Sequence, residues 1–259
     1  KNLVFELSAT DTGETFDGSS LLGNYDVSGS SQQDTIITND DNNTITITSG
    51  DTVDAGAGQD NIQFTVNEAN VSAEVQVVAS IDGGEGIDTF TIQIDMGNPE
   101  LIDISQSTLN NVENLVLENR VNYDGNTNVI RLSTSQVANL NNFSGVDLIQ
   151  LVNGGTIELS HLVTLGLTSG KWSIADDAAY VINGTGTADT FTFTKGNVDV
   201  STGLGDDTFV VNENSTATGT LDAGDGNDFL SIVSGDVDLS KLTITGIEKI
   251  IVSNNIIPS

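Results

Sequence analysis

A short motif of alternating glycines that ends in an aspartate constrains this chain more than any other feature. The pattern Gly-x-Gly-x-Asp, followed by one further residue and then a large apolar one, occurs at residues 56–62, 84–90, 203–209 and 224–230. Alternate glycines permit positive backbone angles, and the short aspartate side chain points back into its own turn. Four chance occurrences in 259 residues are improbable, so the motif indicates a structural repeat.

The motif belongs to a larger duplication. Residues 25–119 and 180–254 each contain one looser copy, two strict copies and a closing apolar segment. The looser copies end at Asp34 and Asp189, which the duplication pairs with each other. We therefore expect an N-terminal strand or cap at 1–24, a first solenoid repeat at 25–119, a spacer at 120–179 that continues the solenoid, and a second repeat with the C-terminal end at 180–259.

The segments between the turns alternate apolar and polar residues over three to six positions, as in Phe90-Thr-Ile-Gln-Ile94 and Phe191-Thr-Phe193. A period of two over short runs predicts short strands with one buried face. Because no single unit has a core of its own, adjacent units must stack, which predicts an all-β solenoid that is tandemly duplicated. Ser133-Thr-Ser-Gln136 is a capping box and predicts one short helical turn.

The charge of the chain excludes several partners. Acidic residues outnumber basic ones 37 to 7, which gives a net charge of −30 that repels nucleic acid and anionic lipid. No apolar run approaches the roughly 18 residues that a membrane-spanning helix needs, so we expect no membrane insertion. Cysteine is absent, which suits a secreted bacterial protein, and the first residue, Lys1, suggests a processed product or a piece of a longer chain.

The turns have the chemistry of a calcium site. Calcium prefers six to eight oxygens at about 2.3–2.6 Å, and a carboxylate with several turn carbonyls from neighbouring coils supplies such oxygens. One aspartate per turn at coil spacing also aligns carboxylates that repel one another unless a cation lies between them. The alternative is that Asp and Gly are there as good turn formers.

The nonapeptide Gly-Gly-x-Gly-x-Asp-x-apolar-x of the repeats-in-toxin calcium-binding proteins resembles these residues. It matches fully at 83–91, and with the first glycine replaced at 55–63, 202–210 and 223–231. The resemblance implies a right-handed parallel β-roll or β-helix with calcium in the turns, and export by a type I system. The closing apolar segments are similar to those of surface-layer proteins and large adhesins that carry such repeats.

The resemblance also implies a set of calcium ligands. The carboxylates would be Asp60, Asp88, Asp207 and Asp228, with Asp54, Asp82 and Asp222 at the neighbouring position. The carbonyls would be those of Gly56, Gly58, Gly83, Gly84, Gly86, Gly203, Gly205, Gly224 and Gly226. Asp34 and Asp189 are either further ligands or simple turn formers. Glu113, Asp147 and Glu248 are interpreted as carboxylates that cap backbone turns.

Nothing in the sequence favours an enzyme. His161 is the single histidine and lies among apolar residues without a nucleophile motif, so we expect a structural role. Trp172 and Tyr180 either line a sugar groove or fill the core. We expect a secreted calcium-binding structural protein of a bacterial surface layer, extracellular fibre or adhesin, which folds and associates head to tail when calcium binds. The alternatives are a noncatalytic calcium module of a secreted enzyme or toxin, and a domain that binds polysaccharide or other surface proteins.

Overall fold

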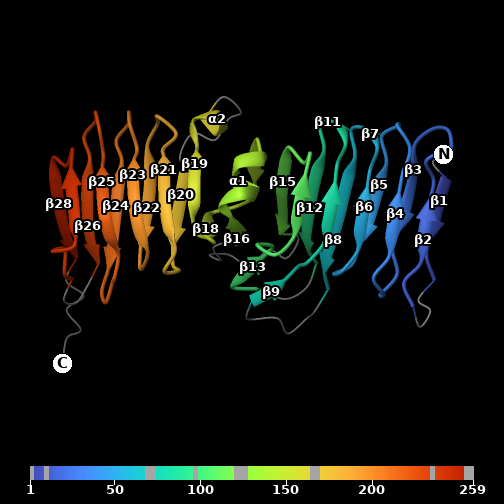
Figure 1. Ribbon diagram of the computed structural model, residues 1–259, viewed down its shortest axis with the longest axis horizontal. Helices are drawn as coiled ribbons and strands as arrows, with labels where there is room; N and C mark the ends of the chain where they lie inside the picture. The colour runs from blue at the N-terminus through green and yellow to red at the C-terminus, as the bar shows by residue number, and fades with distance from the viewer. Residues whose placement is uncertain are drawn as a thin grey trace. The chain divides into compact units, whose positions relative to one another are not determined.

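The computed structural model describes residues 3–8, 12–67, 74–95, 99–119, 128–163, 170–233 and 237–253. Over these ranges the chain is all-β, its strands pair in parallel, and successive coils form a β-solenoid with two short helices (Figure 1). The fold class predicted from the repeats is therefore confirmed. The chain divides into two compact units, residues 1–130 with 139–147 and residues 131–138 with 148–259, and each is described by itself.

Two parallel sheets form the walls of the first unit. We call the strands that lead into the Gly-Asp turns the pre-turn sheet, and the strands that follow these turns the post-turn sheet. The post-turn sheet has the order β1 (Leu3–Glu6), β3 (Tyr25–Ser28), β5 (Thr44–Ile47), β8 (Asn61–Val66), β12 (Thr89–Ile94), β15 (Asn114–Asn119) and β17 (Asn142–Ser144). The pre-turn sheet contains β2 (Thr15–Asp17), β4 (Thr35–Ile37), β6 (Thr52–Asp54), β10 (Ser80–Asp82) and β14 (Thr108–Asn110).

Shorter pairings complete the first unit. Strand β7 (Ala57–Gly58) pairs with β11 (Glu85–Gly86) inside the turns, and β9 (Glu74–Gln76) pairs with β13 (Leu101–Asp103). Strands of successive coils lie side by side and pair in register, so that a residue of one coil lies beside the equivalent residue of the next. Ile62, for example, is in register with Ile45 and with Phe90.

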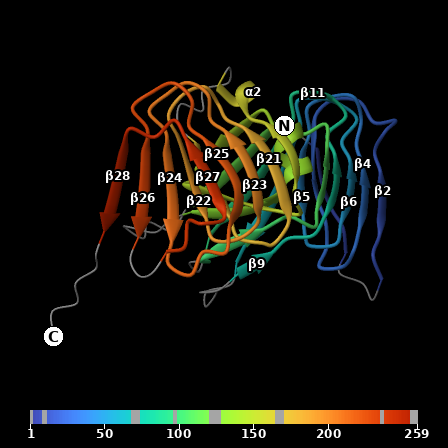
Figure 2. The ribbon, with the colours of Figure 1, turned by 60° about the vertical axis from the view of Figure 1, so that its left-hand side comes forward.

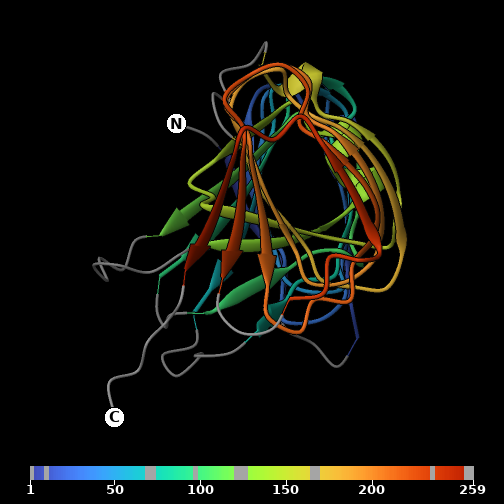
Figure 3. The same cartoon turned by 90° about the vertical axis from the view of Figure 1, so that its left-hand side faces the viewer.

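The second unit repeats the two walls. Its post-turn sheet contains β18 (Leu148–Val152), β20 (Gly170–Ile174), β22 (Asp189–Phe193), β24 (Thr208–Asn212), β26 (Phe229–Val233) and β28 (Lys249–Ser253). Its pre-turn sheet contains β19 (Gly155–Glu158), β21 (Ala179–Asn183), β23 (Asn197–Ser201), β25 (Thr218–Asp222) and β27 (Leu242–Thr245). Figure 2 shows β22, β24, β26 and β28 side by side, and Figure 3 shows the orange and red coils superposed end on.

The remaining elements are β16 (Val129–Ser133), α1 (Thr134–Asn139) and α2 (Ser160–Val163). Helix α1 begins at the predicted capping box, where the backbone N–H of Ser133 donates to Gln136 Oε1 at 2.8 Å. The backbone N–H of Gln136 donates in return to Ser133 Oγ at 3.3 Å. These two bonds confirm the short helix expected at this point.

Columns of apolar side chains, one per coil, fill the interior of each unit. In the second unit Trp172, Phe191, Phe209 and Leu230 occupy successive positions in register, and each is at most 2% exposed. The rings of Trp172 and Phe191 stack with centroids 6.2 Å apart. Tyr180 is 1% exposed, so both aromatic residues considered for a sugar groove belong to the core.

Truncating this column should cost more stability than truncating an apolar residue on the outside of a coil. We expect Phe209→Ala to lower the free energy of unfolding by about 3–5 kcal/mol, because the coils on both sides hold the cavity open. Val181→Ala, at a side chain 42% exposed, should change it by about 0.5 kcal/mol. Urea unfolding of both variants, followed by circular dichroism, measures the difference. Equal losses would show that the column is not the core that holds the coils together.

Candidate functional site

The Gly-Asp turns of adjacent coils stack directly on one another, and this stacking explains the glycines. Gly84 and Gly224 have φ of 86° and 79°, in the left-handed region that glycine adopts most readily. A Cβ at Gly84 would lie 1.6 Å from the carbonyl oxygen of Gly56, and a Cβ at Gly224 would lie 2.2 Å from that of Gly203. Any side chain at these positions would push neighbouring coils apart.

The aspartates of the first unit form a hydrogen-bonded column that we call the first ladder, from Asn43 through Asp60 and Asp88 to Glu113. The backbone N–H of Asn43 donates to Asp60 Oδ1 at 2.7 Å, and that of Asp60 donates to Asp88 Oδ1 at 2.7 Å. The backbone N–H of Asp88 then donates to Glu113 Oε2 at 2.8 Å. Each carboxylate therefore satisfies a backbone donor of the preceding coil.

The second unit contains the same arrangement, the second ladder, from Asp189 through Asp207 and Asp228 to Glu248. The backbone N–H groups of Asp189 and Asp207 donate to the Oδ1 atoms of Asp207 and Asp228, both at 2.7 Å. The backbone N–H of Asp228 donates to Glu248 Oε2 at 2.8 Å. Both ladders have the same bonds and each ends at a glutamate, as the duplication of the sequence implies.

The three carboxylates interpreted as turn caps have that role. Glu113 and Glu248 accept the last backbone N–H of their ladders. Asp147 Oδ2 accepts the backbone N–H of Asn128 at 2.8 Å. The prediction that these residues cap backbone turns is confirmed. His161 is also placed as expected of a structural residue, since its Nδ1 lies 2.6 Å from the carbonyl oxygen of Glu158.

Asp34 does not lie where the duplication placed it. It immediately precedes β4 of the pre-turn sheet, whereas Asp189 begins β22 of the post-turn sheet, so their pairing is wrong. The counterpart in the first ladder is Asn43. The error arose because Asp-Thr-apolar occurs at both corners of a coil, and only the fold shows which corner a given copy occupies.

Asp34 belongs instead to a second acidic column, at the opposite corner of the coil. Its backbone N–H donates to Asp51 Oδ1, and the backbone N–H of Glu14 donates to Asp34 Oδ1, both at 2.8 Å. Asp51 is 0% exposed and was not among the predicted site residues. The sequence carried a signal for it, because Asp51-Thr-Val repeats the Asp-Thr-apolar pattern of Asp34.

The aspartates at the neighbouring position lie outside the ladders. Asp54 and Asp82 end adjacent pre-turn strands and face each other in register, and Asp222 ends β25. Asp82 Oδ1 accepts the side-chain amide of Asn111 at 2.7 Å, and Asp222 Oδ1 accepts the hydroxyl of Thr245 at 2.9 Å. Asp54 is exposed and Asp82 and Asp222 are half-buried, whereas the ladder aspartates are buried.

One oxygen of every ladder aspartate is buried without a hydrogen-bond partner. All five side chains are at most 2% exposed. The unpartnered atoms are Oδ2 of Asp60, Asp88, Asp207 and Asp228, and Oδ1 of Asp189. A buried carboxylate oxygen without a donor is costly while the group is ionised, so each one favours a proton or a cation.

The pKa values respond to this burial. Burial, together with the charge of Asp88 on the next coil, raises the pKa of Asp60 to about 7. Burial raises the pKa of Asp189 to about 6, and the charge of Asp207 acts in the same direction. Burial also raises the pKa of Asp88, Asp207 and Asp228. Full ionisation of a column of buried carboxylates has a high free energy, because the like charges repel one another and little water is present to screen them.

The fit of these residues to calcium is mixed. The unpartnered carboxylate oxygens suit a hard cation. However, the carbonyl of Gly56 accepts the backbone N–H of Glu85 at 2.9 Å, and that of Gly203 accepts the N–H of Asp225 at 2.8 Å. Over the described ranges, no three side chains among Asp, Glu, His and Cys converge as a metal site requires. An ion inside a ladder would therefore have to compete with the bonds that stack the turns.

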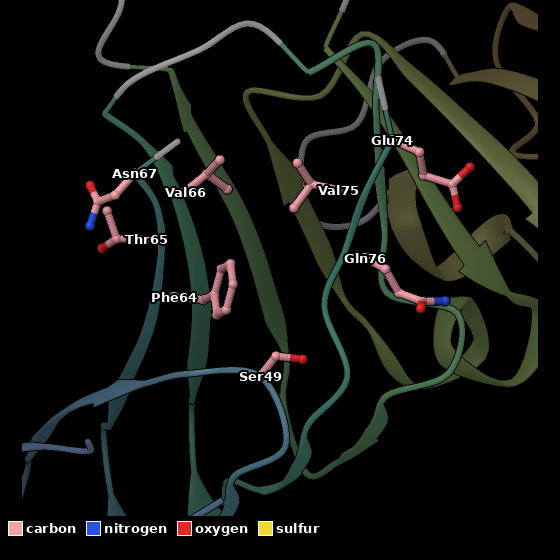
Figure 4. Close-up of a pocket in the computed structure, with 8 residues that line it drawn as sticks. All are labelled: Ser49, Phe64, Thr65, Val66, Asn67, Glu74, Val75 and Gln76. Atoms are coloured by element: carbon pink, nitrogen blue, oxygen red, sulfur yellow. The ribbon is translucent and has the colours of Figure 1, made fainter. Parts of the chain in front are cut away.

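A separate pocket of about 340 Å³ opens between β8 and β9 of the first unit (Figure 4). The half-buried ring of Phe64 and the side chains of Val66 and Val75 form its apolar part, whereas the amides of Asn67 and Gln76 point outward. Pockets with such an apolar lining can contact a small molecule.

With no metal added, the ladders should make the protein less stable as the pH rises. A group whose pKa is higher in the folded state than in the unfolded state contributes stability below its unfolded pKa, and this is lost as pH rises through the folded pKa. For Asp60 that window runs from 3.8 to about 7, and for Asp189 from 3.8 to about 6. Urea midpoints in a chelator should therefore fall between pH 4 and pH 8.

The variant Asp60→Asn tests the origin of this slope. It keeps an acceptor for the Asn43 N–H and removes the charge, so it should flatten the slope and stabilise the metal-free protein at pH 8 by up to about 4 kcal/mol. His161→Ala should leave the slope unchanged. Stability that rises between pH 4 and pH 8 in chelator would contradict the prediction.

Comparison of the chain with protein-family models, with curated proteins and with solved structures gives no match. No helix in the described ranges is long and apolar enough to cross a membrane.

Proposed function

We propose that this chain is a secreted calcium-binding structural protein of a bacterial surface layer, extracellular fibre or adhesin, which folds and self-associates when calcium binds. The observation that supports the proposal most directly is the set of five buried ladder oxygens without a partner, on a chain of net charge −30. Lys195 forms a salt bridge with Asp177 at the surface, so this pair supplies no counter-charge to the buried ladder carboxylates.

Calcium is the cation whose chemistry suits this charge distribution. The carboxylates accumulate at one corner of each coil, together with the less buried Asp54, Asp82 and Asp222. A chain that repels itself at low calcium and is neutralised at millimolar calcium would stay unfolded inside the cell and fold outside. Binding and folding are then linked, because the unfolded chain has no preformed site.

Exposed strand edges support the self-association. In β28, Ile250 and Val252 are 60% and 61% exposed, although their register partners in β26 are the buried Leu230 and the half-buried Ile232. By the duplication, the counterparts of Ile250 and Val252 are Leu115 and Leu117 of β15, which are 0% and 3% exposed. Strand β17 pairs with β15 on its outer side, whereas the described residues include no strand outside β28.

The first strand of the first unit also has exposed apolar side chains and an unpaired edge. Leu3 and Val4 of β1 are 57% and 62% exposed, and β1 is the edge of its sheet in the described part of the chain. Because all strands run parallel, β1 of a second copy can pair with β28 in the same sense as β17 pairs with β15. A second copy is therefore the proposed occupant of this edge.

Calcium should act as a folding ligand. We expect excess chelator at neutral pH to reduce the far-ultraviolet β signal and the melting temperature, and calcium to restore both. Magnesium should substitute poorly, because it requires a small octahedral shell and releases water reluctantly. Asp228→Ala should weaken the response, and His161→Ala should serve as the matched control. An unchanged spectrum and melting temperature after exhaustive chelation would reject the calcium proposal.

Self-association should depend on the exposed edge of β28. In millimolar calcium we expect the wild type to form larger species in analytical ultracentrifugation, and Val252→Lys to remain monomeric because it places a charge where the next strand would pack. Val181→Lys is the control, since Val181 is 42% exposed and lies on β21, between β19 and β23 and away from both edges. A monomeric wild type at high protein concentration, or association unaffected by Val252→Lys, would contradict this assignment.

A further inference from the structure

The two ladders end differently, and the end of the first has features that no Gly-Asp turn shares. Turn 82–88 stacks on the Gly-x-Gly turn 54–60 on one side and on residues 110–113, which contain no glycine, on the other. Asn111 there has a φ of 51°, which is unusual for a residue with a side chain. The backbone N–H of Gly83 donates to the carbonyl of Asn110 at 3.0 Å and holds the two segments together.

Two acceptor oxygens meet at this point. A Cβ on Gly83 would lie 2.1 Å from the carbonyl oxygen of Asn111 and 2.8 Å from Asp88 Oδ2. Gly83 therefore lets the carbonyl approach the carboxylate, and Asp88 is 0% exposed with its Oδ2 unpartnered. Two acceptors close together without a donor favour a cation or a proton in their vicinity.

A polar pocket of about 330 Å³ lies against the same residues. It is lined by Asp82, Asn110, Asn111, Glu113 and Asn139. These are two carboxylates and three carboxamides, so all five lining side chains carry oxygen donors and none is basic. The charges of Glu113 and Asp82 also act on Asp88 behind it, in addition to its burial, and raise its pKa. We call this the ladder-end pocket.

The end of the second ladder has the same backbone and both carboxylates, Asp222 and Glu248, but it lacks the carboxamides. Ala223 replaces Gly83, Thr245 replaces Asn110 and Gly246 replaces Asn111. Gly246 keeps the left-handed backbone with a φ of 73° but has no carboxamide. Glu248 nevertheless caps Asp228 with the same 2.8 Å bond with which Glu113 caps Asp88. The cap is thus common to both ladders, and the oxygen-rich pocket is a property of the first.

We propose that the ladder-end pocket binds one hard divalent cation of the calcium type between the carboxylates of Asp82 and Glu113, with carboxamide and backbone oxygens completing its shell. Calcium accepts six to eight such oxygens in irregular geometry. The pocket supplies carboxylate and carboxamide oxygens, whereas in the stacked turns the carbonyls of Gly56 and Gly203 are already used in hydrogen bonds. The inference rests on the proposed use of calcium, and it places the ion outside the nonapeptide turns.

Glu113→Gln and Glu248→Gln form a matched pair for the test. Each removes one charge from a ladder end while keeping an oxygen that can accept the N–H of the last aspartate. Calorimetric titration of the full chain with calcium chloride should show one site weakened about tenfold or more in Glu113→Gln, because that site loses a charged ligand. Glu248→Gln should titrate like the wild type.

Asp82→Asn is the second variant, since its side-chain oxygen can still accept the Gly84 N–H and the Asn111 amide that Asp82 binds. It should lose the same site, and far-ultraviolet circular dichroism of all variants checks that they fold. If the wild type binds calcium while Glu113→Gln and Asp82→Asn both titrate unchanged, this inference is overturned and the proposed function stands. If the wild type binds no calcium, both fall.

Discussion

A carboxylate that is buried once per coil and accepts the backbone N–H of the coil before it is the interaction on which the rest of this structure depends. A solenoid coil has no core of its own and can satisfy its turn only through its neighbours. The carboxylate supplies the acceptor for one such N–H, and it does so at 2.7 Å from Asp60 to Asp88 and again from Asp189 to Asp207. The register of the coils, the direct stacking of the turns and the need for glycine all follow from keeping this distance.

The same interaction creates the chemical problem of the molecule. Asp60, Asp88, Asp207 and Asp228 each use one oxygen for the neighbouring coil and bury the other without a donor. A proton or a cation can neutralise such a buried carboxylate. A pH above the raised pKa values disfavours the proton, and the proposed calcium would then be the neutralising ion. We therefore expect the ladders to couple the stability of the fold to its ionic surroundings.

The glutamates show how a ladder can end without ending the solenoid. Glu113 caps Asp88, and its carbonyl then accepts the backbone N–H groups of Asn141 and Asn142, so β17 continues the sheet. Glu248 caps Asp228 in the same way, but in the described chain β28 is an open edge. This difference between two otherwise equivalent ends is the basis of the proposed self-association at β28.

Much of this architecture could be predicted from the residues. The spacing of Gly and Asp determined the turns, the period-two apolar runs determined the strands, and both are local properties of a chain that must stack to bury its apolar face. The caps at Glu113, Asp147 and Glu248 and the helix at Ser133 followed from the same local patterns.

Only the tertiary structure decided which corner of a coil each Asp-Thr-apolar copy occupies. It shows that the counterpart of Asp189 is Asn43 and not Asp34. It also decided that the Gly56 and Gly203 carbonyls face donors of the next coil, and that Asp82, Asn111 and Glu113 line one pocket. These facts depend on contacts between residues 17 to 29 positions apart, such as Asn43 with Asp60 and Asn111 with Asp82. A local pattern carries no information about the coil that will lie beside it.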